Sequence, residues 1–215
     1  MTHTRKINVL LVDDHTVVRD GLRAILEVSG EIQCQQAESA EEALAMLNNG
    51  LTVHVVLLDI SLPGMGGLEA LGEMHKLRPG LPILLLSMHP EEQFAVRALR
   101  MGAIGYLSKS TPSAEVWLAV KAAARGENYL SRHAASMVAQ SIQGKDVRPA
   151  HESLSNREFE ILCLIGSGKS VSEIAQISSL SVKTISTYRE RILTKMNLQN
   201  NFDMIRYVLQ EGLLQ

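Results

Sequence analysis

The chain has little cysteine, no long apolar run and no strong net charge, and each absence excludes a class of protein. Its two thiols, Cys34 and Cys163, are predicted to lie in different domains, which argues against a disulfide or a thiolate metal site and favours buried, inert cysteines. No apolar stretch approaches the roughly 18 residues of a membrane-spanning helix, and the polar N-terminus lacks a signal-peptide core. The sequence therefore predicts a soluble cytoplasmic protein with no membrane partner.

The net charge of -2 is small, but the charge is unevenly distributed. Residues 1–150 carry 14 Lys and Arg against 16 Asp and Glu, and residues 151–215 carry 7 against 7. Within the second segment, residues 183–195 hold four basic residues and one acidic residue. This local excess of positive charge, more than the total, indicates a surface for an anionic partner.

The first 125 residues alternate apolar runs with helical patterns. The runs are nearly continuous Val, Ile and Leu, as expected for strands covered on both faces, and they lie at 7–12, 32–37, 53–58, 83–87 and 103–108. Five successive β-α units predict a doubly wound, five-stranded parallel sheet. The hydrophobic content of 46% is sufficient for such a domain and a smaller second one.

The pattern changes after residue 130. A helix is expected over 131–141, and residues 143–152 have no period and few large apolar residues, which is typical of a linker. Three serines then provide helix starts, the first two with Glu three residues later as in a capping box: Ser155, Ser170 and Ser181. With a last helix expected over 201–212 and no strand in view, the second domain is predicted to be small and all-α.

Polar side chains end or directly follow four of the five predicted strands. They are Asp13, Asp14, Asp59, Ser87 and Lys109. In an open parallel sheet, ligands bind beyond the carboxyl ends of the strands, and carboxylates that meet there repel one another unless a cation offsets their charge. Mg²⁺ or Mn²⁺ is the expected cofactor because such cations prefer oxygen ligands, here carboxylates and a backbone carbonyl near Ser61.

A carboxylate at this edge can act as a nucleophile on phosphorus and give an aspartyl phosphate. The metal and Lys109 would stabilise the phosphoryl oxygens, and Ser87 would donate a hydrogen bond to one of them. Each residue alone has a simpler interpretation, since an Asp after a strand, such as Asp14 before Thr16, is usually a helix cap or turn residue. The joint placement at four strand ends favours a functional site.

This set resembles the receiver domain of bacterial two-component response regulators over about residues 5–126. The residues that carry the resemblance are Asp13-Asp14, Asp59 with Pro63 and Gly67, Ser87, Tyr106 and Lys109. The resemblance implies a flavodoxin-like fold, Asp59 as phosphoacceptor, and Asp13, Asp14, Asp59 and Ser61 around the metal. It also implies that Lys109 and Ser87 contact the phosphoryl group and that Ser87 and Tyr106 form the switch pair.

The sequence departs from the family at one position near the site, and three further residues lie around the site. Many receivers have Pro directly after the lysine, whereas here Ser110 follows and the proline is Pro112. Ser61 and His89 occupy positions that line the mouth of the site in this family and are expected to tune phosphoryl hydrolysis. The seven histidines show no ligand spacing, and His15 is interpreted as a surface turn residue beside the acidic pair.

Residues 182–196 are predicted to form an amphipathic helix. At 100° per residue, Ile185, Ile192 and Met196 fall on one face, and Lys183 and Thr187 fall on the other. The helix expected before it, over 170–177, is joined by a four-residue turn, which is the arrangement of a helix-turn-helix whose second helix enters the major groove. A helix with a solvated charged face is an equally good interpretation of the spacing alone.

The segment from Leu154 to Arg189 closely resembles the LuxR-type helix-turn-helix of the NarL/FixJ regulator class. The resemblance implies DNA binding through Lys183, Thr184, Ser186, Thr187, Tyr188, Glu190, Arg191 and Lys195, with Arg189 as a further phosphate contact. Ser186, Thr187 and Glu190 are the candidates for base edges, and the basic residues for phosphates. Ile205, Val208 and Leu209 correspond to the family's dimer contact, although simple packing within the domain is an alternative for them.

The resemblance implies a regulator of transcription with a receiver domain at 1–128, a helix and linker at 129–152 and a DNA-binding domain at 153–215. A sensor histidine kinase would phosphorylate Asp59 and thereby control homodimerisation on promoter half-sites in double-stranded DNA, with RNA polymerase as a further candidate partner. The receiver would catalyse only its own phosphoryl transfer and dephosphorylation. Two alternatives stay open, a regulator that ignores phosphorylation and a Mg²⁺-dependent aspartyl-phosphate hydrolase. The hydrolase would need a second Asp at the position of Ser61.

Overall fold

The structure, a computed structural model, describes residues 6–88, 91–131, 134–136 and 149–213. Its N-terminal part is a five-stranded parallel sheet in the order β2-β1-β3-β4-β5. The strands are β1 (Ile7–Val12), β2 (Ile32–Ala37), β3 (Val55–Asp59), β4 (Ile83–Ser87) and β5 (Gly105–Ser108). The doubly wound sheet predicted from the sequence is confirmed.

Helices cover both faces of this sheet. They are α1 (Thr16–Glu27), α2 (Ala40–Asn48), α3 (Gly67–Leu77), α4 (Glu91–Arg100) and α5 (Ser113–Ala124). Two separate clusters of buried residues result, one between the sheet and α2, α3 and α4, and one between the sheet and α1 and α5. All five residues of β3 and of β4 are buried, because side chains on both faces of a parallel sheet meet a layer of helices.

Three of the five predicted strands have the predicted bounds, and two begin later than predicted. Before β3, the Nδ1 atom of His54 accepts a hydrogen bond from the backbone N–H of Asn8 at 2.9 Å, and the ladder with β1 starts at Val55. Before β5, Ala103 donates its N–H to Ala98 O at 3.0 Å and so closes the end of α4 instead of pairing with β4. Apolar composition alone does not separate these flanking residues from the strands.

The C-terminal part is a bundle of four α-helices preceded by a short 3₁₀ helix, η1 (Ala150–Ser153). The helices are α7 (Asn156–Gly166), α8 (Val171–Ile177), α9 (Val182–Met196) and α10 (Asn201–Gln210). The capping boxes predicted at Ser155 and Ser170 are both present, and Ser181 caps α9 through the N–H of Thr184. η1 corrects the prediction that residues 143–152 are all irregular, since residues 150–152 form its first turn; residues 143–148, like most of the expected helix over 131–141, lie outside the described residues.

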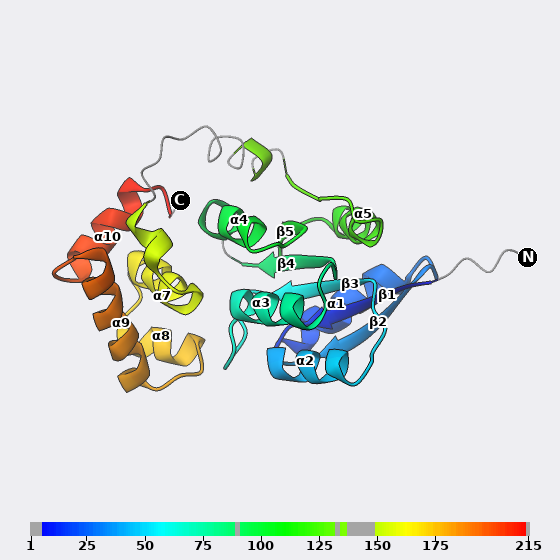
Figure 1. Ribbon diagram of the computed structural model, residues 1–215, viewed down its shortest axis with the longest axis horizontal. Helices are drawn as coiled ribbons and strands as arrows, with labels where there is room; N and C mark the ends of the chain where they lie inside the picture. Colours follow the sequence, from blue (N-terminus) through cyan, green and yellow to red (C-terminus); the bar gives the residue numbers. More distant parts are fainter. Residues whose placement is uncertain (1–5, 89–90, 132–133, 137–148, 214–215) are drawn as a thin grey trace, which may run out of the picture.

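The two parts pack against each other. In Figure 1 the arrowheads of β3 and β4 point toward the C-terminal helices, α7 faces α3 and α4, and α9 and α10 lie on the far side of the bundle. Every residue of α7 from Arg157 to Gly166 is buried, because α7 has the receiver on one side and α9 and α10 on the other. Among the described helices none is both long and apolar enough to cross a membrane.

Candidate functional site: an acidic strand-end cluster and an exposed helix face

The sheet order brings the predicted acidic site together. Asp13 directly follows β1, Asp59 ends β3, Ser87 ends β4 and Lys109 directly follows β5. These four strands are neighbours in the sheet and run in register. The N–H of Lys109 donates to Ser87 O at 2.8 Å, so the lysine backbone is held at the end of β4.

Lys109 forms the centre of the cluster. Its Nζ lies 2.7 Å from Asp59 Oδ2 and 2.7 Å from Asp13 Oδ2; both carboxylates are buried, and the side chain of Lys109 is 9% exposed. Burial raises the pKa of Asp59 despite the opposing charge of Lys109, and the charge of Asp13 adds to that rise. Burial also disfavours the ammonium of Lys109, but the carboxylates of Asp59 and Asp13 outweigh it and raise the pKa of the lysine. Two carboxylates thus share one ammonium group at a site that is shielded from solvent.

The donor atoms fit a divalent cation. Ligand atoms of Asp13, Asp14, His15 and Asp59 all lie within 4.8 Å of one another. With three carboxylates and one ammonium the cluster keeps an excess of negative charge, and carboxylate oxygens are the ligands that hard divalent cations prefer. The histidine was interpreted as a plain surface turn residue; it is exposed, but its Nδ1 lies 2.8 Å from Asp14 Oδ1 and 3.2 Å from Asp13 Oδ1.

The interpretation of Asp14 as a helix cap is not supported. His15 is the N-cap residue of α1, and no side chain caps that terminus. The carboxylate of Asp13 instead accepts the N–H of His15 at 2.8 Å. The acidic pair therefore organises its own loop and leaves the carboxylate of Asp14 at the mouth of the site.

Arg19 supports this loop and was missed by the sequence analysis. Its buried guanidinium donates to the carbonyl of Asp13 and to Thr16 Oγ1. The contact fixes the backbone at the residue whose carboxylate meets Lys109. A signal was present in the sequence, because Arg19 shares the buried face of α1 with Leu22 and Leu26, at the i+3 and i+7 positions where a charged residue is unusual.

The loop between β3 and α3 is tightly closed behind Asp59. The N–H of Gly67 donates to Ile60 O at 2.9 Å, and a Cβ at Gly67 would lie 2.0 Å from Asp59 O. Only glycine fits this approach, which explains the glycine in the motif. The N–H of Ser61 donates to Asp59 Oδ1 at 3.2 Å and so orients the carboxylate from the loop side.

The remaining predicted site residues are distributed as follows. Ser87 and Tyr106 are both buried, Tyr106 in the core with α4, and His89 lies outside the described residues. Pro112 is the N-cap residue of α5, and Thr111 closes the preceding turn through Ser108 O at 2.9 Å. The displaced proline therefore starts a helix three residues after the lysine.

The predicted helix-turn-helix is present in the second domain. α8 and α9 are joined over residues 178–181, where Leu180 donates its N–H to Ala175 O at 2.9 Å and Ser179 adopts a positive φ of 51°. Ile185, Ile192 and Met196 are buried, as the amphipathic pattern predicts. The opposite face of α9 is exposed to solvent.

The candidate DNA-binding residues line this exposed face. Exposed residues are Lys183, Thr187, Glu190, Arg191 and Lys195, and half-buried ones are Thr184, Ser186 and Tyr188. A shallow hollow of about 250 Å³ lies between Lys183, Thr184, Thr187, Tyr188 and Arg191. The guanidinium of Arg191 lies 5.9 Å from the centre of the Tyr188 ring, so a cation and an aromatic ring lie together at the surface.

Two basic residues of α9 have partners within the protein. Lys195 Nζ donates to the buried carboxylate of Glu158 at 2.7 Å, and Arg189 Nε donates to Asn201 Oδ1 at 2.5 Å. The prediction that both mainly contact phosphates did not anticipate these bonds. Lys183 and Arg191 are therefore the basic residues of α9 that are more readily available to DNA phosphates.

The three residues predicted for the dimer contact on α10 do not share one environment. Val208 is fully buried, and a Cβ at Gly166 would lie 2.6 Å from its Cγ1. Packing against α7, the alternative from the sequence, therefore accounts for Val208. Leu209 is 60% exposed and Ile205 is half-buried, which leaves these two for a contact outside the domain.

Two family models match the two parts of the chain. Residues 9–121 match the response regulator receiver domain, and residues 152–208 match the luxR family of bacterial regulatory proteins. The chain belongs to the two-component response regulators of the NarL/FixJ class, which regulate transcription through phosphorylation of a receiver and DNA binding by a helix-turn-helix. Neither match supports the alternative of an aspartyl-phosphate hydrolase.

Individual relatives extend the match over nearly the whole chain. Response regulator UvrY of Escherichia coli K12 is 36% identical over 96% of this chain and 95% of its own length. Response regulator GacA of Pseudomonas protegens is 33% identical over 97% of this chain and 98% of its own length. Each of these matches therefore spans both parts of this chain.

Solved structures agree on the fold. RcsB from Salmonella enterica serovar Typhimurium, bound to promoter P1flhDC in the presence of phosphomimetic BeF₃⁻, has a TM-score of 0.62 and 26% identity, covering 96% of this chain and all of the RcsB chain. The same protein bound to promoter rprA gives a TM-score of 0.63 at 25% identity, with 95% of this chain covered.

Proposed function

We propose that a sensor histidine kinase phosphorylates Asp59 and that the phosphorylated chain forms a homodimer on two DNA half-sites. The observation that carries this proposal is the buried carboxylate of Asp59 at 2.7 Å from Lys109 Nζ, at the edge of the sheet where the acidic pair converges. The carboxylate of Asp59 is paired with one ammonium, and the exposed Asp14 lies beside it in the same acidic cluster. The chain's only covalent chemistry is on its own aspartate.

The phosphoryl transfer uses the cluster as follows. An oxygen of Asp59 attacks phosphorus, the new O–P bond forms as the P–N bond of the kinase's phosphohistidine breaks, and the imidazole nitrogen takes up a proton. Lys109 stays within reach of the phosphoryl oxygens, and Asp13, Asp14, Asp59 and the backbone at Ser61 would hold Mg²⁺ or Mn²⁺. A bound cation supplies charge neutralisation at the phosphoryl oxygens.

The phosphoryl group acts as a signal through the switch pair. Phosphorylation adds about -1.5 to -2 charge at Asp59. Ser87 donates to a phosphoryl oxygen, and Tyr106, buried beside α4, follows it, which changes the surface at β5 and α4. The charge added at Asp59 thus changes which surface of the receiver is available to associate with another receiver.

The DNA contact is divided between two kinds of residue. Ser186, Thr187 and Glu190 read base edges, with Glu190 able to accept from cytosine N4, while Lys183, Arg191 and in part Lys195 contact phosphates. Thr184 and Tyr188 contribute at the rim of the hollow, and Ile205 and Leu209 contribute to the dimer. The receiver spans residues 1–128 and the DNA-binding domain 153–215, with a linker between; the regulator acts in the cytoplasm, where DNA and RNA polymerase are.

The proposal is tested by labelling the full chain with acetyl phosphate and Mg²⁺ and by measuring binding to promoter DNA. Asp59→Asn should abolish labelling and the increase in DNA affinity that labelling causes. Asp20→Asn is the matched control, since Asp20 is an exposed aspartate on α1, and it should label as the wild type does. Undiminished labelling of Asp59→Asn would overturn the site, and equal DNA affinity with and without phosphodonor would favour a regulator that ignores phosphorylation.

A further inference from the structure

The imidazole of His15 lies among the carboxylates of the strand-end cluster. Its Nδ1 is 2.8 Å from Asp14 Oδ1 and 3.2 Å from Asp13 Oδ1. The backbone N–H of His15 donates to the same oxygen of Asp13 at 2.8 Å, which fixes the residue beside the acidic pair. Of the four ligand atoms that lie within 4.8 Å of one another, that of His15 is the one nitrogen.

His15 is an unusual residue for its position in the chain. It is the N-cap of α1, where Ser, Thr, Asp and Asn are preferred because their side chains accept a hydrogen bond from the first turn of the helix. The side chain of His15 forms no such bond and contacts the two carboxylates instead. The start of α1 therefore lacks a side-chain cap, and its N-cap side chain is placed in the acidic cluster.

The distances around Nδ1 resemble those between ligands of a single ion. With metal–ligand bonds of about 2.1 Å, adjacent ligands lie about 3.0 Å apart in an octahedral site and about 3.4 Å apart in a tetrahedral one. The separations of Nδ1 from the two carboxylate oxygens, 2.8 and 3.2 Å, are close to this range. Only small movements are needed for Nδ1 and both oxygens to bind the same cation.

A hydrogen bond is the simpler account of the same distances. In neutral imidazole one ring nitrogen donates and the other accepts, so Nδ1 either donates a proton to a carboxylate or offers a lone pair to a cation. The two accounts differ in which side chains can replace the imidazole. An amide can donate the hydrogen bond, but it cannot provide the metal–nitrogen bond.

The cluster retains negative charge for a cation. Lys109 Nζ lies 2.7 Å from Asp13 Oδ2, yet this buried oxygen accepts no hydrogen bond of good geometry from the described residues. The short distance reflects attraction between the two charges, and the poor geometry means that Lys109 does not satisfy the carboxylate fully. A bound cation can therefore complete the coordination of Asp13.

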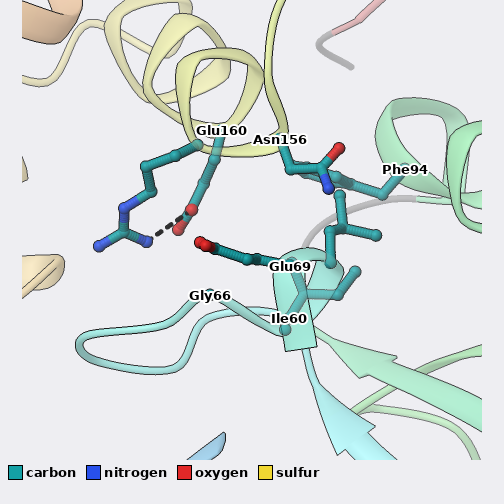
Figure 2. Close-up of a pocket in the computed structure, with 9 residues that line it drawn as sticks. Ile60, Gly66, Glu69, Phe94, Asn156 and Glu160 are labelled. Atoms are coloured by element: carbon teal, nitrogen blue, oxygen red, sulfur yellow. Dashed lines mark hydrogen bonds and ion pairs between the residues drawn. The ribbon is translucent and has the colours of Figure 1, made fainter. Parts of the chain in front are cut away.

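A second pair of carboxylates lies near the site but is not equivalent to it. Figure 2 shows the carboxylate of Glu69, at the start of α3, pointing toward that of Glu160 in α7. Glu160 is already paired with Arg157 at 2.7 Å, and the cavity that both glutamates line measures about 10 Å³, roughly the space of one water. A cation is therefore expected at the strand-end cluster, and Glu69 provides a control.

We infer that Nδ1 of His15 binds the divalent cation directly and gives the site a preference for Zn²⁺ and similar transition-metal ions over Mg²⁺. Imidazole is a good ligand for Zn²⁺, whereas Mg²⁺ is bound by oxygen atoms of carboxylates, carbonyls and water. The inference rests on the proposed function, because the cation is the one beside the phosphoacceptor Asp59, and it names the residue that selects this cation.

Amide NMR spectra of the full chain, titrated with Zn²⁺ or with Mg²⁺, test the inference. The amide of Ser61, which donates to Asp59 Oδ1 at 3.2 Å, reports cation binding at this site. Loss of a group that only supports a metal ligand typically costs about 10- to 100-fold in affinity, so His15→Asn should weaken Zn²⁺ binding at least about tenfold. Mg²⁺ binding should change less than about twofold, because asparagine keeps a hydrogen-bond donor for the acidic pair and provides an oxygen.

Two further variants serve as controls. His75→Asn removes an imidazole near the end of α3, where Nε2 lies 3.1 Å from Gly102 O, and Glu69→Gln removes a carboxylate of the second pair (Figure 2). Both should leave the two affinities unchanged. Equal weakening of Zn²⁺ and Mg²⁺ binding by His15→Asn would contradict the role of His15 in selection. An effect of Glu69→Gln as large as that of His15→Asn would overturn the placement of the cation.

The wild-type chain gives a second measurement that does not depend on the folding of any variant. Nitrogen-15 spectra of its histidine rings are recorded as Zn²⁺ is added. A shift of the Nδ1 signal of His15 in step with the Ser61 amide supports direct binding, and an unshifted Nδ1 signal at saturation would overturn it. Labelling of Asp59 by acetyl phosphate is measured separately. A chain that shows the shift but is not labelled supports the inference and contradicts the proposed function.

Discussion

The two functional regions of this chain are built in opposite ways. At the strand-end cluster, the buried carboxylates of Asp13 and Asp59 each form an ion pair of 2.7 Å with Lys109, whose side chain is largely shielded from solvent, before any ligand arrives. On α9, Lys183, Glu190 and Arg191 are exposed, and the hydroxyl of Thr187 is occupied by its own backbone, donating to Lys183 O at 3.1 Å. The first region is preorganised, and the second is completed by its partner.

The difference follows from what each region must do. Phosphoryl transfer requires charged groups that are held in fixed positions and shielded from water, so that they interact strongly. Burial at the edge of the sheet provides this shielding. DNA binding depends on many weak contacts to a polyanion, and exposed cations release counterions when they meet it. A single substitution should therefore have a large effect in the cluster and a graded effect on the helix.

The largest effect is expected from Lys109→Met. Without the ammonium, the carboxylates of Asp59 and Asp13 lose their shared partner, and the phosphoryl oxygens lose a preorganised cation. Removal of one such group typically reduces a rate by about 10²- to 10³-fold, so the initial rate of labelling by acetyl phosphate should fall by about 100-fold. Lys76→Met, on the exposed side of α3, is the control and should label normally. A fall of less than about threefold would mean that Lys109 only balances charge.

The next largest effect is expected on the free energy of unfolding, from a substitution in the loop that follows Asp59. Gly67→Ala brings a Cβ to 2.0 Å from Asp59 O, and relieving that clash should cost at least about 2 kcal/mol of unfolding free energy. Gly72→Ala, in the same helix with no atom within 4 Å of its Cβ, should instead stabilise by about 0.5 to 1 kcal/mol. Urea unfolding of both variants measures the difference. Equal effects would show that the loop yields easily and is not preorganised.

The sequence revealed the preorganised region better than its supports. Strand ends are visible as apolar runs that stop at polar residues, so Asp13, Asp59, Ser87 and Lys109 could be placed at one edge from periodicity and the rules of parallel sheets. Arg19 was overlooked because its contact is with a backbone carbonyl, which no side-chain motif records. The capping boxes of α7 and α8 were predicted because their partners are three residues apart.

The contact between the two domains could not be predicted. Phe94 in α4 and Phe159 in α7 pack edge to face there, with ring centroids 5.3 Å apart. They are separated in the sequence by β5, α5 and the linker, and each looks like an ordinary core residue of its own domain. Pairing of Lys195 with Glu158 has the same origin, since the partners are 37 residues apart and both also suit a solvent-exposed helix face. Periodicity identifies the apolar face of a helix but not the distant residues that pack against that face.

The smallest effect is expected on the helix, where Lys183 and Lys195 provide a matched pair. Lys183 lies exposed near the N-terminus of α9, whereas Lys195 is partly neutralised by Glu158 at 2.7 Å. Each phosphate contact contributes about 0.9 to the slope of log affinity against log salt. Lys183→Ala should reduce that slope by about 0.9 per subunit. The loss of affinity between 50 and 200 mM salt should then be roughly three- to fourfold smaller than in the wild type. Lys195→Ala should reduce the slope by less. Fluorescence anisotropy with promoter DNA over this salt range measures both slopes; if Lys195→Ala has the larger effect, the bond to Glu158 opens on DNA and the helix is remodelled by its partner.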